Sequence, residues 1–148
     1  MSDIEFLKNY FKSLQNLINN ENYLKDLVLV KDILKKTHSE GKKTMIFGNG
    51  GSAAIASHFS VDLTKNARVR CANYNESDLL TCFSNDFGYE KWVEKAIEFY
   101  ADEGDNVILI SAGGNSPNMV NGAKQSKKKK IGKIITFTGN DKNNNLSK

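Results

Sequence analysis

The sequence predicts an α/β fold in which a parallel sheet carries helices on both faces. Short apolar segments alternate with amphipathic helical segments along the chain, a pattern typical of parallel sheets with helical crossovers. Two of the apolar segments, 44–47 and 106–110, each run into a glycine-containing turn and then into a helix. Turns of this kind on neighbouring parallel strands face the same end of the sheet, where open α/β folds bind ligands.

Two amphipathic helices are predicted before the first strand. Apolar residues recur at helical spacing from Ile4 to Ile18 and again from Leu24 to Leu34, with a polar interruption at 19–22 between them. Gly41 is a natural end for the second helix. Both helices carry more apolar residues than one sheet face needs, so we expect the region 1–41 to associate with other copies of the chain.

The remaining elements follow from the same periodicities. The expected strands are 44–47, 69–72, 106–110 and 133–138, and the expected helices are 52–65, 76–82, 89–100 and one that Ser116 or Asn115 caps and Pro117 begins. A loop is expected at 84–88 and a polar, disordered tail at 139–145. We therefore expect one domain over 1–148, with helices at 1–41, the sheet core at 42–139 and the tail at 140–148.

Composition indicates a globular protein with one core. The chain has 148 residues, of which 39% are hydrophobic and 26% charged. No apolar run reaches the length of a bilayer span and no export signal is recognisable, so we expect a cytoplasmic protein with no membrane partner. Cys71 and Cys82 are accordingly expected to be reduced thiols.

The net charge of +4 does not by itself indicate a nucleic-acid partner. Four consecutive lysines at 127–130 lie at a predicted helix end, where cations favour the helix C-terminus and solvent. No aromatic residues alternate with them to stack on bases, and no DNA-binding motif is present. We expect no nucleic acid among the partners.

The first glycine turn, Gly48-Asn49-Gly50-Gly51-Ser52, has the composition of an anion-binding turn. Backbone N–H groups, the positive end of a helix and a serine hydroxyl would surround one small concavity, which suits phosphate. The turn is neither a dinucleotide-binding fingerprint nor a P-loop. A tight turn that needs glycine for a positive φ remains an equal interpretation.

The second turn and a polar pair offer further donors. Ser111, Ser116 and Asn118 could surround an anion, with Gly113 allowing close backbone approach, although a simple helix cap explains the same residues. Asn85-Asp86 could contact a ligand or cap the following helix.

His58 and Asp62 lie four residues apart on the helix that follows the first turn, so their side chains project from one face. Such a pair can ligate a metal, or the carboxylate can act as a base. A surface pair of little energy is the alternative. His38, in a lysine-rich helix end, is expected to be plain surface.

A series of motifs follows in one order along nearly the whole chain: Phe47-Gly48-Asn49-Gly50-Gly51-Ser52, Ser57-His58-Phe59, Asp62-Leu63-Thr64, Ser84-Asn85-Asp86-Phe87-Gly88-Tyr89, Gly104-Asp105, Ile110-Ser111, Gly114-Asn115-Ser116-Pro117-Asn118 and Thr136-Phe137-Thr138-Gly139. Together they resemble the phosphoheptose isomerases, which are sedoheptulose 7-phosphate isomerases of the sugar isomerase (SIS) superfamily. The resemblance implies a flavodoxin-like sheet and a cytoplasmic homotetramer whose N-terminal helices pack between subunits.

The resemblance also implies a set of site residues. A sugar phosphate would be bound by Asn49, Gly50, Gly51, Ser52, Asp62, Asn85, Asp86, Ser111, Ala112, Gly113 and Ser116. His58 and Asp62 match metal ligands, with zinc as the implied cofactor, and Asp62 matches the catalytic carboxylate.

The implied reaction converts sedoheptulose 7-phosphate to D-glycero-manno-heptose 7-phosphate, a precursor of lipopolysaccharide or capsule heptose, through an enediol. Three departures predict impaired activity. Asp62 stands where the family has glutamate, Ala112-Gly113 replaces two hydroxyl residues, and the sequence ends before the C-terminal helix that supplies a second histidine and another metal ligand. A non-catalytic SIS module that binds a sugar phosphate or a protein partner as a regulator is the alternative.

Overall fold

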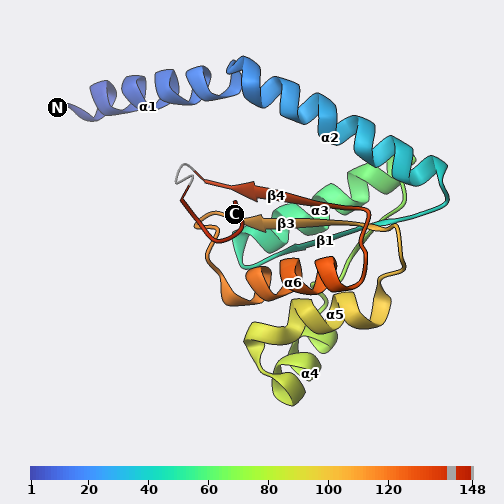
Figure 1. Ribbon diagram of the computed structural model, residues 1–148. Coiled ribbons are helices and arrows are strands. Elements are labelled where there is room, and N and C mark those ends of the chain that lie inside the picture. The colour runs from blue at the N-terminus through green and yellow to red at the C-terminus, as the bar shows by residue number, and fades with distance from the viewer. Residues whose placement is uncertain (140–142, 148) are drawn as a thin grey trace. The chain divides into compact units, whose positions relative to one another are not determined.

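The computed structural model describes residues 1–139 and 143–147 and contains a four-stranded parallel sheet (Figure 1). The strand order is β2-β1-β3-β4, with β1 at Thr44–Gly48, β2 at Cys71–Asn73, β3 at Asn106–Ser111 and β4 at Lys133–Thr138. The helices are α1 (Asp3–Ile18), α2 (Glu21–Ser39), α3 (Gly51–Lys65), α4 (Ser77–Phe87), the short 3-10 helix η1 (Tyr89–Lys91), α5 (Trp92–Tyr100) and α6 (Pro117–Lys128). The predicted α/β class is confirmed.

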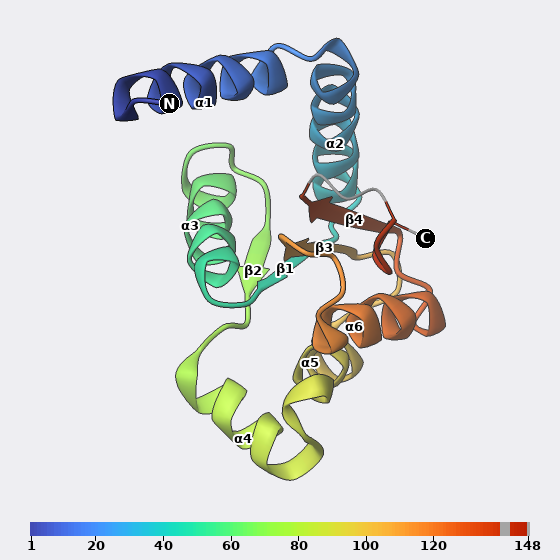
Figure 2. The ribbon, with the colours of Figure 1, turned by 90° about the vertical axis from the view of Figure 1, so that its left-hand side faces the viewer.

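Helices cover both faces of the sheet, with α3 on one side and α5 and α6 on the other (Figure 2). Met45 and Phe47 of β1, with Val107 and Leu109 of β3, belong to one buried cluster that includes Trp92 of α5. Ile46 and Ile108, at the alternate positions, are also fully buried but lie outside that cluster. Alternation along a strand sends successive side chains to opposite faces, so strands covered on both sides are apolar throughout.

The chain divides into two compact units, Met1–Ile33 and Leu34–Lys148. The first unit holds α1 and the beginning of α2. The hydroxyl of Ser2 accepts a hydrogen bond from the Glu5 N–H (3.3 Å), and the side-chain oxygen of Asn20 accepts one from the Asn22 N–H (3.0 Å), so polar side chains cap both helices. The predicted interruption between the two helices is confirmed.

Large apolar side chains in the first unit are exposed. Phe11 and Ile18 are 60% and 61% exposed, and no residue of α1 is buried. Twelve more share this condition, namely Met1, Ile4, Phe6, Leu7, Tyr10, Leu14, Leu17, Tyr23, Leu24, Leu27, Val28 and Leu29. An exposed apolar surface of this extent is typical of an interaction face.

Some local predictions were wrong in detail. The stretch 84–87 is the last turn of α4 and not a loop, because the first helix-terminating residue is Gly88, which has a φ of 91°. Strand β2 begins at Cys71, since the N–H of Val69 is bonded to the Leu63 carbonyl at the end of α3. His38 is half-buried, and its Nδ1 accepts a hydrogen bond from the Arg70 N–H (3.2 Å).

Disorder was predicted for 139–145 and is wrong for residues 143–145, whereas 140–142, like 148, lie outside the described residues. Leu146 is buried in the main core cluster, and its N–H donates to the Gly114 carbonyl (3.1 Å). Asn144 is buried as well and donates to the Thr138 hydroxyl (3.3 Å). One apolar side chain is enough to dock an otherwise polar segment here because backbone and amide hydrogen bonds accompany it. Within the described residues, no helix combines the length and the apolar character needed to cross a bilayer.

Candidate functional site

Both glycine turns lie at one edge of the sheet, as predicted. Strands β1 and β3 are adjacent and parallel, and Gly48 at the end of β1 pairs in register with Ile110 near the end of β3. The two segments that follow β1 and β3 therefore leave the sheet side by side at its carboxyl edge. This is the position at which open α/β sheets bind ligands.

The first turn passes from β1 into α3 with almost no intervening loop. A Cβ atom on Gly48 would lie 2.2 Å from the carbonyl oxygen of Ser52, so only glycine allows this approach. The N–H of Ser52 donates to the Asn49 carbonyl (2.9 Å). Within 1–139 and 143–147, no residue accepts from the N–H groups of Gly50 and Gly51. These two donors at a helix N-terminus are able to bind an anion.

The second turn combines backbone donors with two hydroxyls. The Ser111 and Ser116 hydroxyl oxygens are 3.3 Å apart, and the Gly114 N–H donates to the Ser111 carbonyl (3.0 Å). Ser116 occupies the N-cap of α6, and Pro117 is its first residue, as the sequence predicted. Gly113, like its neighbour Ala112, is exposed. The turn therefore combines the hydroxyls of a buried Ser111 and a half-buried Ser116 with an accessible backbone at a second helix N-terminus.

Asn118 does not act as a free donor at this turn. Its side chain is buried and forms two hydrogen bonds with the side chain of Asn49, at 3.0 and 2.8 Å. The hydroxyl of Tyr89 also donates to the Asn49 side-chain oxygen (3.1 Å). Tyr89 is not among the predicted site residues, although it directly follows the Asn85-Asp86-Phe87-Gly88 stretch. This network joins the first turn to the start of α6 and to η1.

Asn85 and Asp86 are exposed on the last turn of α4 and do not cap a helix. The side-chain amide of Asn85 donates to Asp86 (3.0 Å), and the thiol of Cys82 approaches the other Asp86 oxygen (3.7 Å). The negative charge of Asp86 raises the pKa of Cys82 above its usual value because it disfavours a thiolate nearby. The pair therefore presents an exposed carboxylate and amide.

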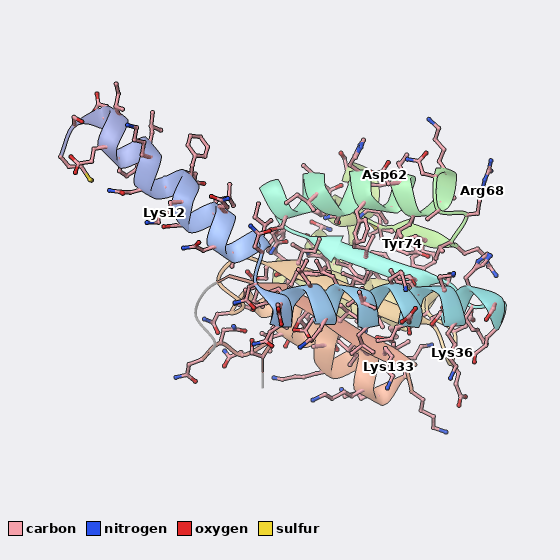
Figure 3. The ribbon with its side chains drawn as sticks, turned by 90° about the horizontal axis from the view of Figure 1, so that it is seen from above. Lys12, Lys36, Asp62, Arg68, Tyr74 and Lys133 are labelled. Carbon is pink, nitrogen blue, oxygen red and sulfur yellow. The ribbon has the colours of Figure 1, made fainter. Side chains whose placement is uncertain are left out.

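His58 and Asp62 lie on α3 with Nε2 and Oδ2 3.6 Å apart, and their side chains are 79% and 48% exposed. Asn66 donates a hydrogen bond to the other Asp62 oxygen (2.9 Å). Asp62 is in the C-terminal half of α3 (Figure 3). Since α3 begins at Gly51 and rises 1.5 Å per residue, Asp62 lies about 16 Å along the helix from the first turn. Within one chain the structure does not bring Asp62 together with the glycine turns.

The described residues do not complete a zinc site. Zinc in proteins has four ligands at structural sites and three plus an open position at catalytic sites. His58 and Asp62 supply two, and among residues 1–139 and 143–147 no three His, Cys, Asp or Glu side chains gather to hold a metal ion. The described residues of one chain therefore supply too few ligands to hold a resident zinc ion.

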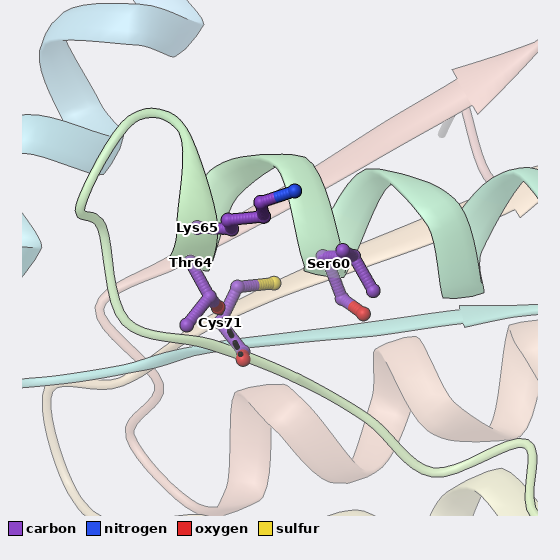
Figure 4. Close-up of a pocket in the computed structure, with 5 residues that line it drawn as sticks. Ser60, Thr64, Lys65 and Cys71 are labelled. Carbon is purple, nitrogen blue, oxygen red and sulfur yellow. Dashed lines mark hydrogen bonds between the residues drawn. The ribbon is translucent and has the colours of Figure 1, made fainter.

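A surface hollow between α3 and β2 contains none of the predicted site residues (Figure 4). Ser60, Val61, Thr64, Lys65 and Cys71 line it, and the Thr64 hydroxyl donates to the Cys71 carbonyl (3.1 Å). Burial raises the pKa of the Cys71 thiol to about 12, because a thiolate loses solvation there. A thiol that remains protonated at neutral pH is a poor nucleophile.

Residues 5–139 match the family described as the SIS domain. The chain is 35% identical over 132 residues to a phosphoheptose isomerase of Fusobacterium nucleatum, covering 86% of this chain and 68% of that protein. The chain is a SIS-domain protein of the phosphoheptose isomerase family. A second phosphoheptose isomerase, from Buchnera aphidicola, is 33% identical over 135 residues and is matched over 69% of its length, by 88% of this chain.

Solved structures of phosphoheptose isomerases share the fold. That of the Neisseria gonorrhoeae protein superposes with a TM-score of 0.82 at 25% identity, over 94% of this chain and 76% of the other. That of the Francisella tularensis protein has a TM-score of 0.86 at 21% identity, over 99% and 80%. The family is an isomerase family, and the resemblance seen in the sequence motifs is confirmed. The SIS-domain match includes both glycine turns, α3 and α4.

Proposed function

We propose that this chain binds a sugar phosphate at the carboxyl edge of its sheet and is an aldose-ketose isomerase for sedoheptulose 7-phosphate. The observation that carries the proposal is the pair of glycine turns that end the adjacent strands β1 and β3, each at a helix N-terminus. Phosphate binds well at such positions because N–H groups and the helix dipole both point toward it. The relatives at 35% and 33% identity are named for the same reaction class.

In this proposal the substrate is bound by three segments. The phosphate contacts the hydroxyls of Ser111 and Ser116 and the backbone around Ala112 and Gly113. The first turn, Asn49 to Ser52, contributes its free N–H groups and the Asn49 amide. Asn85 and Asp86 accept or donate hydrogen bonds to sugar hydroxyls, which suits their exposed carboxylate and amide.

The chemistry requires a base beside the substrate carbonyl. A carboxylate removes a proton from the hydroxyl-bearing carbon next to the carbonyl, and the carbonyl oxygen gains a proton to give the enediol. The other hydroxyl then loses its proton as the carboxylic acid returns a proton to the former carbonyl carbon, so the net change moves one hydrogen between the carbons and one between the oxygens. We assign this role to Asp62, with His58 beside it. A base must lie within hydrogen-bonding distance of the proton it removes. Because Asp62 is about 16 Å along α3 from the first turn, we propose that it acts on a sugar held by the turns of another copy.

A homotetramer is the proposed assembly that brings two such copies together. The exposed apolar side chains of α1 and of the first part of α2 support association, since burying them removes apolar surface from water. Zinc would need ligands in addition to His58 and Asp62, and no step of the reaction above depends on it.

A non-catalytic sugar-phosphate sensor is the second candidate. The observation that favours it is the distance between Asp62 and the turns. Asp62 is also a shorter carboxylate than the glutamate that the family resemblance implies. The two candidates share the binding site and differ only in turnover.

One experiment tests both candidates. Sedoheptulose 7-phosphate is incubated with the purified chain with and without zinc, turnover is followed by NMR, and thermal shift reports binding. Turnover by the original chain, together with no turnover by the double variant Ser111→Ala/Ser116→Ala, would support the isomerase. A thermal shift without turnover would favour the sensor, and the absence of both would overturn the proposed site. Asp78→Ala, on exposed α4 outside the site, is the matched control and should behave as the original chain.

A further inference from the structure

The two glycine turns are joined by a pair of asparagine side chains. Asn49 follows β1 and Asn118 lies in the first turn of α6, 69 residues later. The Asn49 amide donates to the Asn118 oxygen (3.0 Å), and the Asn118 amide donates to the Asn49 oxygen (2.8 Å). Asn118 is 1% exposed, so water does not compete for these bonds.

The orientation of both amides is determined by one backbone group. The N–H of Met119 donates to the side-chain oxygen of Asn118 (3.1 Å), and a backbone N–H can donate only to an oxygen here. The side-chain nitrogen of Asn118 must then face Asn49. The side-chain oxygen of Asn49 must therefore point toward that nitrogen to accept its hydrogen bond. The hydroxyl of Tyr89 donates to that same oxygen (3.1 Å). A flipped Asn49 would lose both bonds with Asn118 and would turn an N–H toward Tyr89, whose hydroxyl would then have to accept instead of donate.

The pairing leaves one N–H of Asn49 for a ligand. One of the two amide hydrogens is donated to Asn118, and within the described ranges 1–139 and 143–147 no residue accepts the second. Asn49 is half-buried beside the free N–H groups of Gly50 and Gly51. A fixed amide at this place adds a directed donor for an oxygen of the ligand.

We propose that Asn118 and Tyr89 are positioning residues of the sugar-phosphate site, which hold the Asn49 amide in one orientation so that its second N–H binds a ligand oxygen. The proposal rests on the proposed function and adds two residues to it. Tyr89 also connects the first turn to the segment that carries Asn85 and Asp86, because η1 follows α4 after a single residue, Gly88. Preorganised donors bind more tightly than donors that must be ordered by the ligand.

The test compares Tyr89→Phe with Tyr100→Phe. Both remove one phenol hydroxyl from a half-exposed ring, but the Tyr100 hydroxyl has no hydrogen-bond partner among the described residues. Calorimetry measures the Kd of sedoheptulose 7-phosphate and of inorganic phosphate. We expect Tyr89→Phe to weaken sugar-phosphate binding roughly fivefold, the effect of one neutral hydrogen bond, while Tyr100→Phe binds as the original chain. Where turnover is measurable, Tyr89→Phe should raise KM and leave kcat within about twofold. This is the result expected when the lost interaction binds the substrate and the transition state equally.

A second comparison tests whether Tyr89 acts through Asn49. In an Asn49→Ala background the further change Tyr89→Phe should have no effect on Kd, and a persistent fivefold loss would overturn the proposal. Asn118→Asp keeps the shape and the acceptor for Met119 but places an oxygen against the Asn49 oxygen. It should weaken binding at least as much as Tyr89→Phe, with an unchanged circular dichroism spectrum confirming the fold.

The outcomes separate this inference from the proposed function. If the original chain binds the sugar phosphate and Tyr89→Phe binds equally well, the positioning role is wrong and the proposed function stands. If the original chain binds neither ligand, the proposed function is wrong and the positioning role falls with it.

Discussion

In the proposed role of catalytic base, Asp62 is one methylene shorter than the glutamate that the family resemblance implies at this position, and proton transfer tolerates little displacement. A carboxylate drawn back by roughly 1 Å can lose a factor of about 100 in rate. The Asn66 amide holds one Asp62 oxygen at 2.9 Å, which further restricts its reach.

We therefore expect Asp62→Glu to raise the rate of sedoheptulose 7-phosphate isomerisation, by up to about 100-fold, with little change in substrate affinity. Initial rates and KM measured by NMR provide the check. Asp62→Asn is the matched control because it keeps the length of aspartate and removes the base, and it should be inactive. Equal rates for Asp62→Glu and Asp62→Asn would exclude Asp62 as the base.

At the scale of elements, the turn between β3 and α6 is supported from outside by the chain after β4. Gly114 has a φ of 63°, and a Cβ atom there would lie 2.2 Å from Cγ of Asn144. The Asn145 N–H donates to the side chain of Asn115 (2.9 Å), and the Leu146 N–H donates to the Gly114 carbonyl. The second turn is thus shaped by a segment about 30 residues away.

Gly114→Ala should destabilise the protein by about 1–3 kcal/mol, since it combines strain at positive φ with a clash against a buried side chain. Gly113→Ala is the control at the neighbouring position, where an added Cβ meets nothing within 4 Å. Urea unfolding followed by circular dichroism measures both. A loss of stability for Gly113→Ala as large as for Gly114→Ala would show that the docked segment is not the cause.

At the scale of the whole molecule, an ion-pair cluster joins the amino ends of β1 and β3. Asp105 is 1% exposed and accepts hydrogen bonds from the N–H groups of Lys43 (3.0 Å) and Asp102 (2.9 Å). The Lys43 ammonium contacts the carboxylates of both aspartates. Burial lowers the pKa of Lys43, but hydrogen bonds and charges from Asp102 and Asp105 outweigh this and raise it above 10.5. The hydrogen bond from Lys43 lowers the pKa of Asp102 below 3.8.

These pKa shifts predict a stability that is lost at both extremes of pH. The contribution of Lys43 is present below pH 10.5 and disappears as pH rises through its raised pKa, whereas that of Asp102 is present above pH 3.8 and disappears as pH falls through its lowered pKa.

Lys43→Met should cost about 3 kcal/mol at neutral pH, because it leaves the buried Asp105 charge unpaired. The free energies of unfolding of Lys43→Met and of the original chain, measured in urea, should differ most at neutral pH and converge at both extremes of pH. Lys36→Met, at an exposed pair with Glu40, should show little effect at any pH.

The exposed apolar side chains of α1 and α2 predict association in solution. Four copies of a 16.5 kDa chain would sediment as a particle of about 66 kDa. Phe11→Asp should dissociate it, since it places a charge among apolar side chains, and Lys12→Glu is the neighbouring control at a charged position. Sedimentation velocity distinguishes these cases, and a stable monomer of the original chain would rule out the proposed tetramer.

The local features of this fold follow from residues close together in sequence. Consecutive apolar residues at 45–47 predict a strand covered on both faces, and glycine after each of two strands predicts a turn into a helix. These predictions were correct because periodicity and turn chemistry act over a few residues. The bounds were wrong at the end of α4, which continues as far as Phe87, and at the start of β2, which a hydrogen bond between Val69 and Leu63 delays to Cys71.

What only the tertiary structure decided are the contacts between distant segments. The pairing of Asn49 with Asn118 spans 69 residues and that of Lys43 with Asp105 spans 62, and neither follows from local spacing. Leu146 is an isolated apolar residue in a polar stretch, so its burial is invisible to periodicity. The sequence by itself determined the α/β class, the family and the two glycine turns, because these lie in short motifs. The partners of Asn49 and the docking of residues 143–147 depend on how the strands assemble into one sheet.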